Sequence, residues 1–300
     1  MAENRTRTEK FWEGISAVRR FTSNILFLLI FLIFIFVFVG FLLQGGVEDP
    51  KGKALVINPS GPIVEQMEGI GGDPLSIILQ GPPQKGVLLR NILKVLEAVQ
   101  DDQRIDYVIL KLDNIYGTGQ TVLYDVGQAL SNLKKSGKTI IAVGDNYDES
   151  AYYLASFSNE IILNPDGVVL FEGYSRFRTY YKDFLEKLKI SINLFRVGKY
   201  KSAMEPYIRN DMSEEAKKAN KAWMGELWQA WKVEVAKNRD LKPEDIQNFA
   251  DNAHIFIKKE KGDIATALLK ANLIDKLLNR TQTREYLMDK MGKSEDEKTL

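Results

Sequence analysis

Two lysines that could do chemistry, Lys199 and Lys201, follow an apolar run and precede a capped helix in the segment Phe195–Ser213. A lysine can act as a general base only when neutral, and an ordinary lysine with a pKa of about 10.4 is almost entirely protonated at pH 7. A catalytic lysine therefore needs a desolvated pocket, because burial lowers its pKa. The neighbouring residues could build such a pocket, although most lysines near a strand end are solvated. The candidate pocket residues are Ile192, Leu194, Phe195, Val197, Ala203, Met204 and Tyr207, with Gly198 as a turn.

The sequence around these lysines also has a recognisable order. Residues 196–203 read RVGKYKSA and are followed by EPYIR and, after one residue, by DMS. This segment resembles the one that carries the catalytic lysine in the signal-peptide peptidase A family, also called protease IV, in its long form. The long form has two homologous halves, and the chain resembles the N-terminal half from a membrane anchor to about Asp275. In that family the lysine of the Tyr-Lys-Ser triplet deprotonates a nucleophilic serine, so the resemblance implies that Lys201 is the base and Lys199 a solvated neighbour.

A second segment, residues 144–153, stands where an active half of this family carries its nucleophile. The chain reads GDNYDESAYY there, whereas an active half resembles Ala-Ser-Gly-Gly-Tyr with the serine at the start of a helix. Matching the tyrosines places Glu149 at the serine position, with Ser150 and Ala151 at the two glycine positions. Ser150 would need a one-residue shift, which turns a helical side chain by about 100°, so we interpret it as a surface or capping residue. The resemblance thus implies that the nucleophile is missing here and comes from a second domain.

Three further groups have alternative interpretations. Glu149 could mimic a general base, but an acidic residue at a helix start more often complements the helix dipole. The turn Asp113–Gly119 could present backbone N–H groups to an oxyanion; the family's active half has Pro-Gly-Gly there, and an ordinary tight turn is the preferred interpretation. The single histidine, His254, could in principle serve a serine, but it lies among lysines and is expected at the surface or the edge of the core.

Composition excludes several classes of site. The 300 residues include 41 basic and 40 acidic side chains, a net charge of +1, which gives no sign of nucleic-acid binding. The chain has no cysteine, which rules out a thiol nucleophile, a disulfide and a cysteine metal site within it. One histidine cannot make a histidine-rich metal site. We expect neither a metal nor a cofactor.

The stretch Ile25–Leu43 holds 19 apolar residues, glycine included, enough to cross a hydrocarbon core of roughly 30 Å. A cleaved signal peptide is the weaker alternative, because its apolar region normally spans only about 7 to 15 residues. Basic residues precede the stretch and acidic residues follow it, so the positive-inside rule places residues 1–24 in the cytoplasm and the large domain in the periplasm. The sequence predicts a single-pass protein of the inner membrane. The basic residues before the apolar stretch are Arg5, Arg7, Lys10, Arg19 and Arg20, and the acidic residues after it are Glu48 and Asp49.

Beyond the anchor, helical and strand patterns alternate, which predicts a parallel sheet with crossover helices. The family resemblance implies that this α/β domain is of the crotonase/ClpP-like type. The predicted strands are Ala54–Ile57, Gly61–Glu65, Tyr107–Leu112, Thr139–Val143 and Glu160–Leu163, with another entering the lysine segment. Helices are predicted from the apolar positions in Leu89–Val99 and Val122–Leu133, and at about Ser150–Phe157 and Phe177–Leu188. A further helix starts near Ser213 and carries apolar residues on one face: Ala216, Ala219, Trp223, Leu227 and Trp231. A closing helix and turn are predicted at Ala265–Asp275.

The predicted organisation is a cytoplasmic tail (1–24), a transmembrane anchor (25–43), a linker (44–53), the peptidase-like domain (54–291) with a glycine- and proline-rich loop at 67–86, and a polar tail or linker (292–300). The resemblance implies a membrane-anchored serine peptidase with a Ser/Lys dyad that degrades cleaved signal peptides, to which this chain contributes the lysine. Partners would be peptides, the membrane, and either further copies of the chain or a serine-bearing peptidase domain. The main alternative is an inactive anchored scaffold that assembles with related subunits; acyl-CoA chemistry on the same fold is remote.

Overall fold

The computed structural model describes residues 7–43, 54–67 and 86–292. Contacts between residues divide the chain into two compact units, Met1–Asp49 and Pro50–Leu300, which are described separately. The expected linker at 44–53, most of the expected loop at 67–86 and the polar tail from residue 293 lie outside the described residues.

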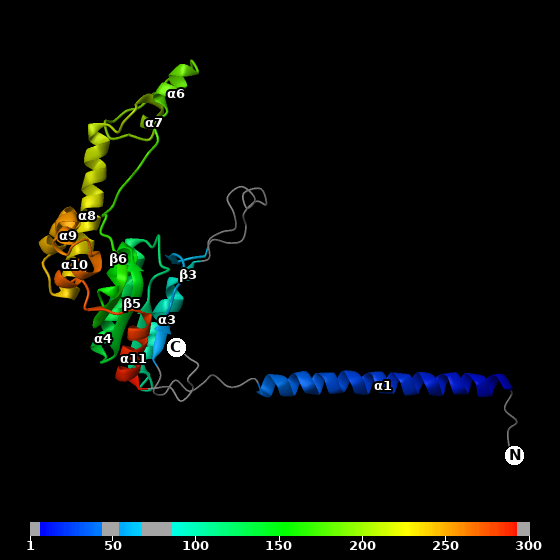
Figure 1. Cartoon of the computed structure of the whole chain (residues 1–300). Helices are drawn as coiled ribbons and strands as arrows, with labels where there is room; N and C mark the ends of the chain where they lie inside the picture. Colours follow the sequence, from blue (N-terminus) through cyan, green and yellow to red (C-terminus); the bar gives the residue numbers. More distant parts are fainter. Residues whose placement is uncertain (1–6, 44–53, 68–85, 293–300) are drawn as a thin grey trace. The chain divides into compact units, whose positions relative to one another are not determined.

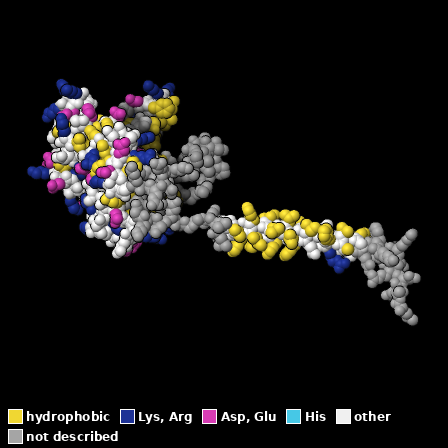
Figure 2. All heavy atoms as spheres, turned by 60° about the horizontal axis from the view of Figure 1, so that its bottom comes forward, with side chains coloured by type: hydrophobic (Ala, Val, Ile, Leu, Met, Phe, Trp, Pro, Cys, Tyr) yellow, Lys and Arg dark blue, Asp and Glu magenta, His cyan; other side chains and the backbone are white. Residues whose placement is uncertain are grey.

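The first unit is one long helix, α1 (Arg7–Leu43). Within it, Gly14–Gly40 is long and apolar enough to cross a membrane, and the predicted anchor at 25–43 overlaps this stretch. Figure 2 shows its apolar side chains as a continuous band, with basic side chains toward the N-terminal end. Side chains from Phe21 to Val39 are exposed on every side, as expected for a helix whose neighbours would be lipid.

The second unit is built on a parallel five-stranded sheet in the order β1-β4-β5-β6-β7 (Figure 1). Its strands are β1 (Leu55–Ile57), β4 (Tyr107–Lys111), β5 (Thr139–Tyr147), β6 (Glu160–Val169) and β7 (Lys276–Leu277). All four neighbouring pairs are parallel. A separate two-stranded parallel sheet joins β2 (Ile63–Val64) to β3 (Val87–Leu88). The predicted α/β class with a parallel sheet is therefore confirmed.

Helices bury both faces of this sheet, as a parallel sheet requires. Alternate residues of β4 show the division: Val108 and Leu110 join the main core, whereas Ile109 packs in a smaller cluster with Leu287. Leu287 belongs to α11 (Arg280–Met291), so α11 covers one face. The main core contains buried residues of α3 (Leu89–Asp101), α4 (Gln120–Lys135), α5 (Glu149–Ala155) and α10 (Ile264–Lys270).

Two strands run further than the sequence pattern predicted. β5 continues from Val143 to Tyr147, through the residues predicted to turn, and β6 continues from Leu163 to Val169. The pairing shifts register between Gly144 and Asn146, which is how the chain adds a bulge without leaving the sheet. Asn146 fixes this extension because its side-chain oxygen accepts a hydrogen bond from the Val168 backbone at 2.9 Å.

Three other predictions about elements were wrong. The helix predicted at Phe177–Leu188 is confined to α6 (Lys182–Lys187), and residues 191–197 form no strand. The long helix α8 (Glu214–Arg239) buries Ala216 and Trp231 as predicted, but Ala219 and Trp223 are exposed. The exposed apolar residues in these segments have no core beside them in the part of the chain that the structure describes, so their spacing does not indicate burial.

The remaining helices complete two substructures. α9 (Pro243–Lys259) and the C-terminal half of α8 enclose aromatic side chains around Trp231, which is 1% exposed. The Phe171 and Trp231 rings pack with their centroids 5.5 Å apart. Residues 177–213, which we call the arm, contain α6 and α7 (Glu205–Ile208), and Figure 1 shows both helices beyond the N-terminal end of α8, away from the sheet.

Candidate functional site

Lys201 lies in a tight turn on the arm. Its backbone N–H donates to the Gly198 carbonyl at 3.5 Å, and Gly198 has a φ of +106°, a conformation that favours glycine. The Lys201 side chain folds back over this turn, since a Cβ added at Gly198 would lie 3.9 Å from its Cγ and Cε. Arg196 closes the turn by donating from Nη1 to the Lys201 carbonyl at 2.9 Å.

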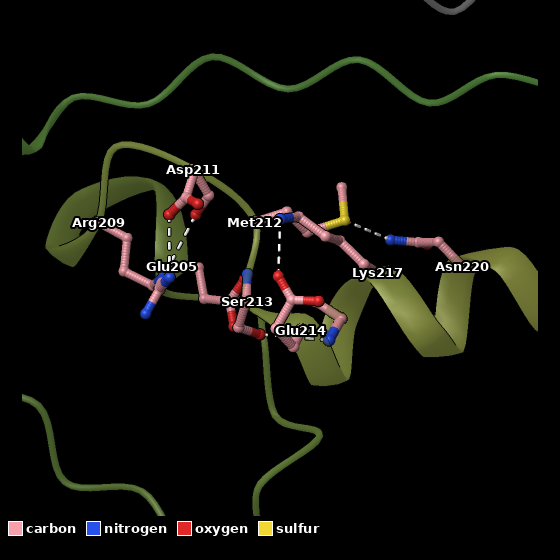
Figure 3. A network of polar contacts seen from close by, with 9 residues as sticks. Glu205, Arg209, Asp211, Met212, Ser213, Glu214, Lys217 and Asn220 are labelled. Carbon is pink, nitrogen blue, oxygen red and sulfur yellow. Dashed lines mark hydrogen bonds and ion pairs between the residues drawn. The ribbon is translucent and has the colours of Figure 1, made fainter.

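Two anchors hold this turn to the rest of the arm. The guanidinium of Arg178 donates to the carbonyls of Ser202 and Ala203 at 3.3 and 3.1 Å. On the other side, the carboxylate of Glu205 accepts hydrogen bonds from the hydroxyl and the backbone N–H of Ser213, the latter at 3.2 Å (Figure 3). Glu205 is only 1% exposed, so these bonds replace lost hydration.

The Ser213 hydroxyl also caps α8, because it accepts from the Ala216 backbone N–H at 3.2 Å. The first turn of the helix carries Glu214 and Glu215, as predicted. Glu205 therefore connects the lysine turn directly to the start of α8. Neither Glu205 nor Arg178 was predicted from the sequence to belong to the site. The only local signal for Glu205 is an acidic residue directly before a proline at a helix start.

The described residues do not form the desolvated pocket predicted around Lys201. Lys199 and Lys201 are both exposed. Of the apolar residues expected to line the pocket, only Leu194 is half-buried and the others are exposed, with Phe195 96% and Val197 84% exposed. Their segment has no regular secondary structure, and none of the strands that the structure describes pairs with it.

Glu149 is the first residue of α5, directly after the Asp148 cap, whose side chain accepts from the Ala151 backbone N–H at 2.7 Å. The Glu149 carboxylate accepts a hydrogen bond from the backbone N–H of Gly173. Its own carbonyl accepts from the Trp231 indole at 3.1 Å. Burial raises the pKa of the Glu149 carboxyl, and the hydrogen bonds from backbone N–H groups partly oppose this shift.

These contacts give Glu149 a structural connection between the start of α5, the chain after β6, and α8. Ser150 is partly buried beside it, and Ala151 is buried. The structure does not bring Glu149 and Lys201 together. Glu149 follows β5 of the sheet, whereas Lys201 belongs to the arm, whose helices α6 and α7 lie near the N-terminal end of α8 and away from the sheet (Figure 1).

The other candidates make structural contacts. In the turn after β4, the hydroxyl of Thr118 accepts from the Ile63 backbone N–H at 3.1 Å, and Gly117 has a φ of +62°. Asp113 accepts from the backbone N–H of Asp145 at 2.5 Å and so ties this turn to the β5 extension. His254 is exposed on α9.

Comparison with known proteins identifies the family. Residues 132–293, more than half of the chain, match the description "Peptidase family S49". The chain is 34% identical over 291 residues to "Protease 4" of Salmonella typhi, covering 95% of this chain and 47% of that protein. It is 31% identical over 292 residues to "Protease 4" of Haemophilus influenzae (strain ATCC 51907 / DSM 11121 / KW20 / Rd), covering 96% and 47%. The chain thus spans about half the length of the curated relatives it matches.

Among solved structures, a single-residue mutant of the "1510-N membrane-bound stomatin-specific protease" is similar to this chain with 13% identity and a TM-score of 0.39, covering 78% of this chain and 84% of that one. The described part of the second unit has a parallel five-stranded sheet with helices in the crossover connections. The lysine turn, the α5 start and the closing helix α10 all fall within the matched residues. The chain therefore belongs to peptidase family S49.

Proposed function

We propose that this chain is the general-base half of a membrane-anchored serine peptidase that degrades peptides such as cleaved signal peptides. Lys201 is the base, and a serine-bearing peptidase domain, on a longer chain or on a partner, supplies the nucleophile. The observation that carries this proposal is the presentation of Lys201: its turn is anchored through Arg178 and Glu205, yet its side chain is exposed.

The proposed chemistry follows from that exposure. A general base must be neutral, and exclusion of water favours the neutral form of an amine, so a second domain must cover the turn. Neutral Nζ then takes the proton from the serine hydroxyl as its oxygen attacks the peptide carbonyl. The same nitrogen returns the proton to the leaving amine when the carbon–nitrogen bond breaks. The exposed apolar residues Phe195 and Val197 flank the turn and supply surface for such a cover.

The experiment is to reconstitute the full chain with a serine-bearing peptidase domain and to measure peptide turnover. Lys201→Ala should reduce turnover by at least about 10² to 10⁴ while assembly is retained. Lys201→Arg should fail as well, because a guanidinium stays protonated. Lys199→Ala is the matched control and should retain activity, since its side chain lies two residues away on the same exposed turn. Turnover within a few fold of the wild-type value for Lys201→Ala would refute the proposed base.

The chain by itself should not form an acyl-enzyme, because a glutamate stands at the position proposed for the nucleophile. A serine-directed fluorophosphonate probe should leave the purified full chain unlabelled. Labelling mapped to Ser150 would instead show that the one-residue-shifted alignment is the correct one.

A non-catalytic scaffold is the second candidate, and the Glu149 contacts favour it. The Glu149 carboxylate accepts a hydrogen bond from the Gly173 backbone N–H, which is a contact typical of a structural residue. In this case the chain anchors related peptidase subunits, and the Lys201 variants should leave turnover of the reconstituted complex unchanged.

We further propose a single-pass orientation in the inner membrane, with residues 1–24 in the cytoplasm. The basic residues before the apolar stretch support it through the positive-inside rule. Protease added to intact spheroplasts should remove the large domain. Protection of that domain would refute this orientation.

A further inference from the structure

A groove of about 510 Å³ opens between residues 172–176 and α8. Its apolar lining includes Met212, Met224 and Trp228. Unbranched methionine side chains adapt to different ligand shapes, so this lining suits a variable apolar group rather than one fixed ligand. The groove is distinct from the lysine turn, since none of its lining residues belongs to 196–203.

The edge of the groove at Tyr174 and Arg176 continues into a length of unpaired backbone. Among the residues that the structure describes, none forms a hydrogen bond with a backbone N–H or carbonyl of residues 174–180. This stretch has no regular secondary structure and is mostly exposed. Unpaired, exposed backbone is the feature by which an extended peptide is recognised, because the peptide can add main-chain hydrogen bonds to it.

A positioned cation lies on the same edge. Arg176 donates from Nη1 to the side-chain oxygen of Asn220 at 2.9 Å, and Asn220 is only 8% exposed. Asn220 is itself held in place, because its oxygen also accepts from the Trp223 indole at 3.2 Å and its nitrogen donates to Met212 Sδ at 3.0 Å. One neutral bond orients the guanidinium without neutralising its charge.

The groove carries an excess of positive charge. Lys221 also lines it and has no ion pair with any residue in the described ranges. Lys217 is already paired with Glu214 at 2.9 Å, and Glu172 is the only acidic lining residue in the described part of the chain. The groove therefore complements a ligand with an apolar portion and a negative charge.

We propose that this groove binds the C-terminal end of a short apolar peptide. The peptide chain pairs with the backbone of residues 174–180, its apolar side chains contact Met224 and Trp228, and its terminal carboxylate binds Arg176. Such a ligand is the product of peptide cleavage, so this inference rests on the proposed function and adds a product-retention site to it.

The test uses the full chain in lipid nanodiscs and a fluorescein-labelled pentapeptide, Leu-Ala-Leu-Ala-Leu, with a free C-terminal carboxylate. Fluorescence anisotropy measures binding, with empty nanodiscs as the blank for partition into lipid. The free acid should bind about tenfold more tightly than the same peptide with a C-terminal amide, as one charge-assisted contact in an open groove implies. Arg176→Gln should remove this preference, whereas Arg284→Gln, an exposed arginine on α11, should retain it.

Each other outcome overturns a defined part of the proposal. Equal binding of acid and amide would refute carboxylate recognition, and absence of saturable binding would refute the site. Displacement by laurate as effective as by the unlabelled peptide would identify a fatty-acid site, because laurate has no main chain to pair with residues 174–180. Lys201→Ala should leave peptide binding unchanged, so failure of this site and failure of the proposed base are measured separately.

Discussion

Replacing Glu205 with alanine should loosen the junction between the lysine turn and α8. The substitution removes the carboxylate that accepts two hydrogen bonds from Ser213, and it leaves a backbone N–H without its partner in a buried place. Hydrogen bonds to a charged group contribute about 1.5 to 3 kcal/mol each. Taking the lower value for both bonds, the free energy of local opening should fall by about 3 kcal/mol.

Hydrogen exchange measured by mass spectrometry on the full chain tests this directly. The first backbone amides to respond should be those of Ala216 and Lys217, which donate to the side chain and the backbone carbonyl of Ser213. A loss of about 3 kcal/mol corresponds to exchange faster by about 100-fold. Glu205→Gln keeps the shape and an acceptor but loses the charge, so an increase nearer tenfold is expected.

Glu186→Gln provides the matched control. Glu186 is an exposed glutamate on α6 whose ion pair with Lys182 measures 3.6 Å, and exposed pairs of this kind contribute at most about 1 kcal/mol. The hydrogen-exchange rates at the start of α8 in the Glu186→Gln variant should equal those of the wild-type chain. Rates for Glu205→Ala within about threefold of the wild-type values would refute the view that Glu205 anchors the turn. In a Ser213→Ala background the effect of Glu205→Ala should shrink, because one of the two bonds is then already absent.

Three further predictions concern stability. Trp231→Ala should lower the free energy of unfolding by about 3 to 5 kcal/mol, because the ring is fully buried; a loss below about 1 kcal/mol in denaturant titration would contradict this. Gly144→Ala should lower the free energy of unfolding by about 1 to 3 kcal/mol, since the new Cβ would lie 2.8 Å from the Tyr147 ring. Gly225→Ala, with open space around it in α8, should instead raise the free energy of unfolding by up to about 1 kcal/mol. Equal shifts of the melting temperature in the two variants would refute this difference. Burial raises the pKa of the Glu149 carboxyl, so the folded chain binds more protons than the unfolded chain, and its free energy of unfolding should fall as pH rises through the titration of this carboxyl. Glu149→Gln should reduce this dependence of stability on pH. An unchanged pH profile in the variant would contradict the raised pKa.

The sequence by itself determined the elements whose burial follows a local period. Helical spacing from Leu89 to Val99 and the apolar run after Tyr107 correctly placed α3 and β4, because both pack against a continuous core. The apolar stretch in α1 could also be predicted from the sequence alone, since a continuous run of apolar residues is sufficient to indicate a helix that could cross a membrane. Where one periodic segment faces one environment, the pattern of residue types is sufficient.

Only the tertiary structure decided how far β5 and β6 extend and what contacts Glu149. Those features depend on pairs distant in the chain, such as Asn146 with Val168 and Glu149 with Gly173, which no local period records. In the lysine segment the local pattern misled the prediction. Its apolar residues predicted a strand and a pocket, but they lie on an arm where no other described residues form a second layer, so their hydrophobicity corresponds to exposed surface rather than to a core.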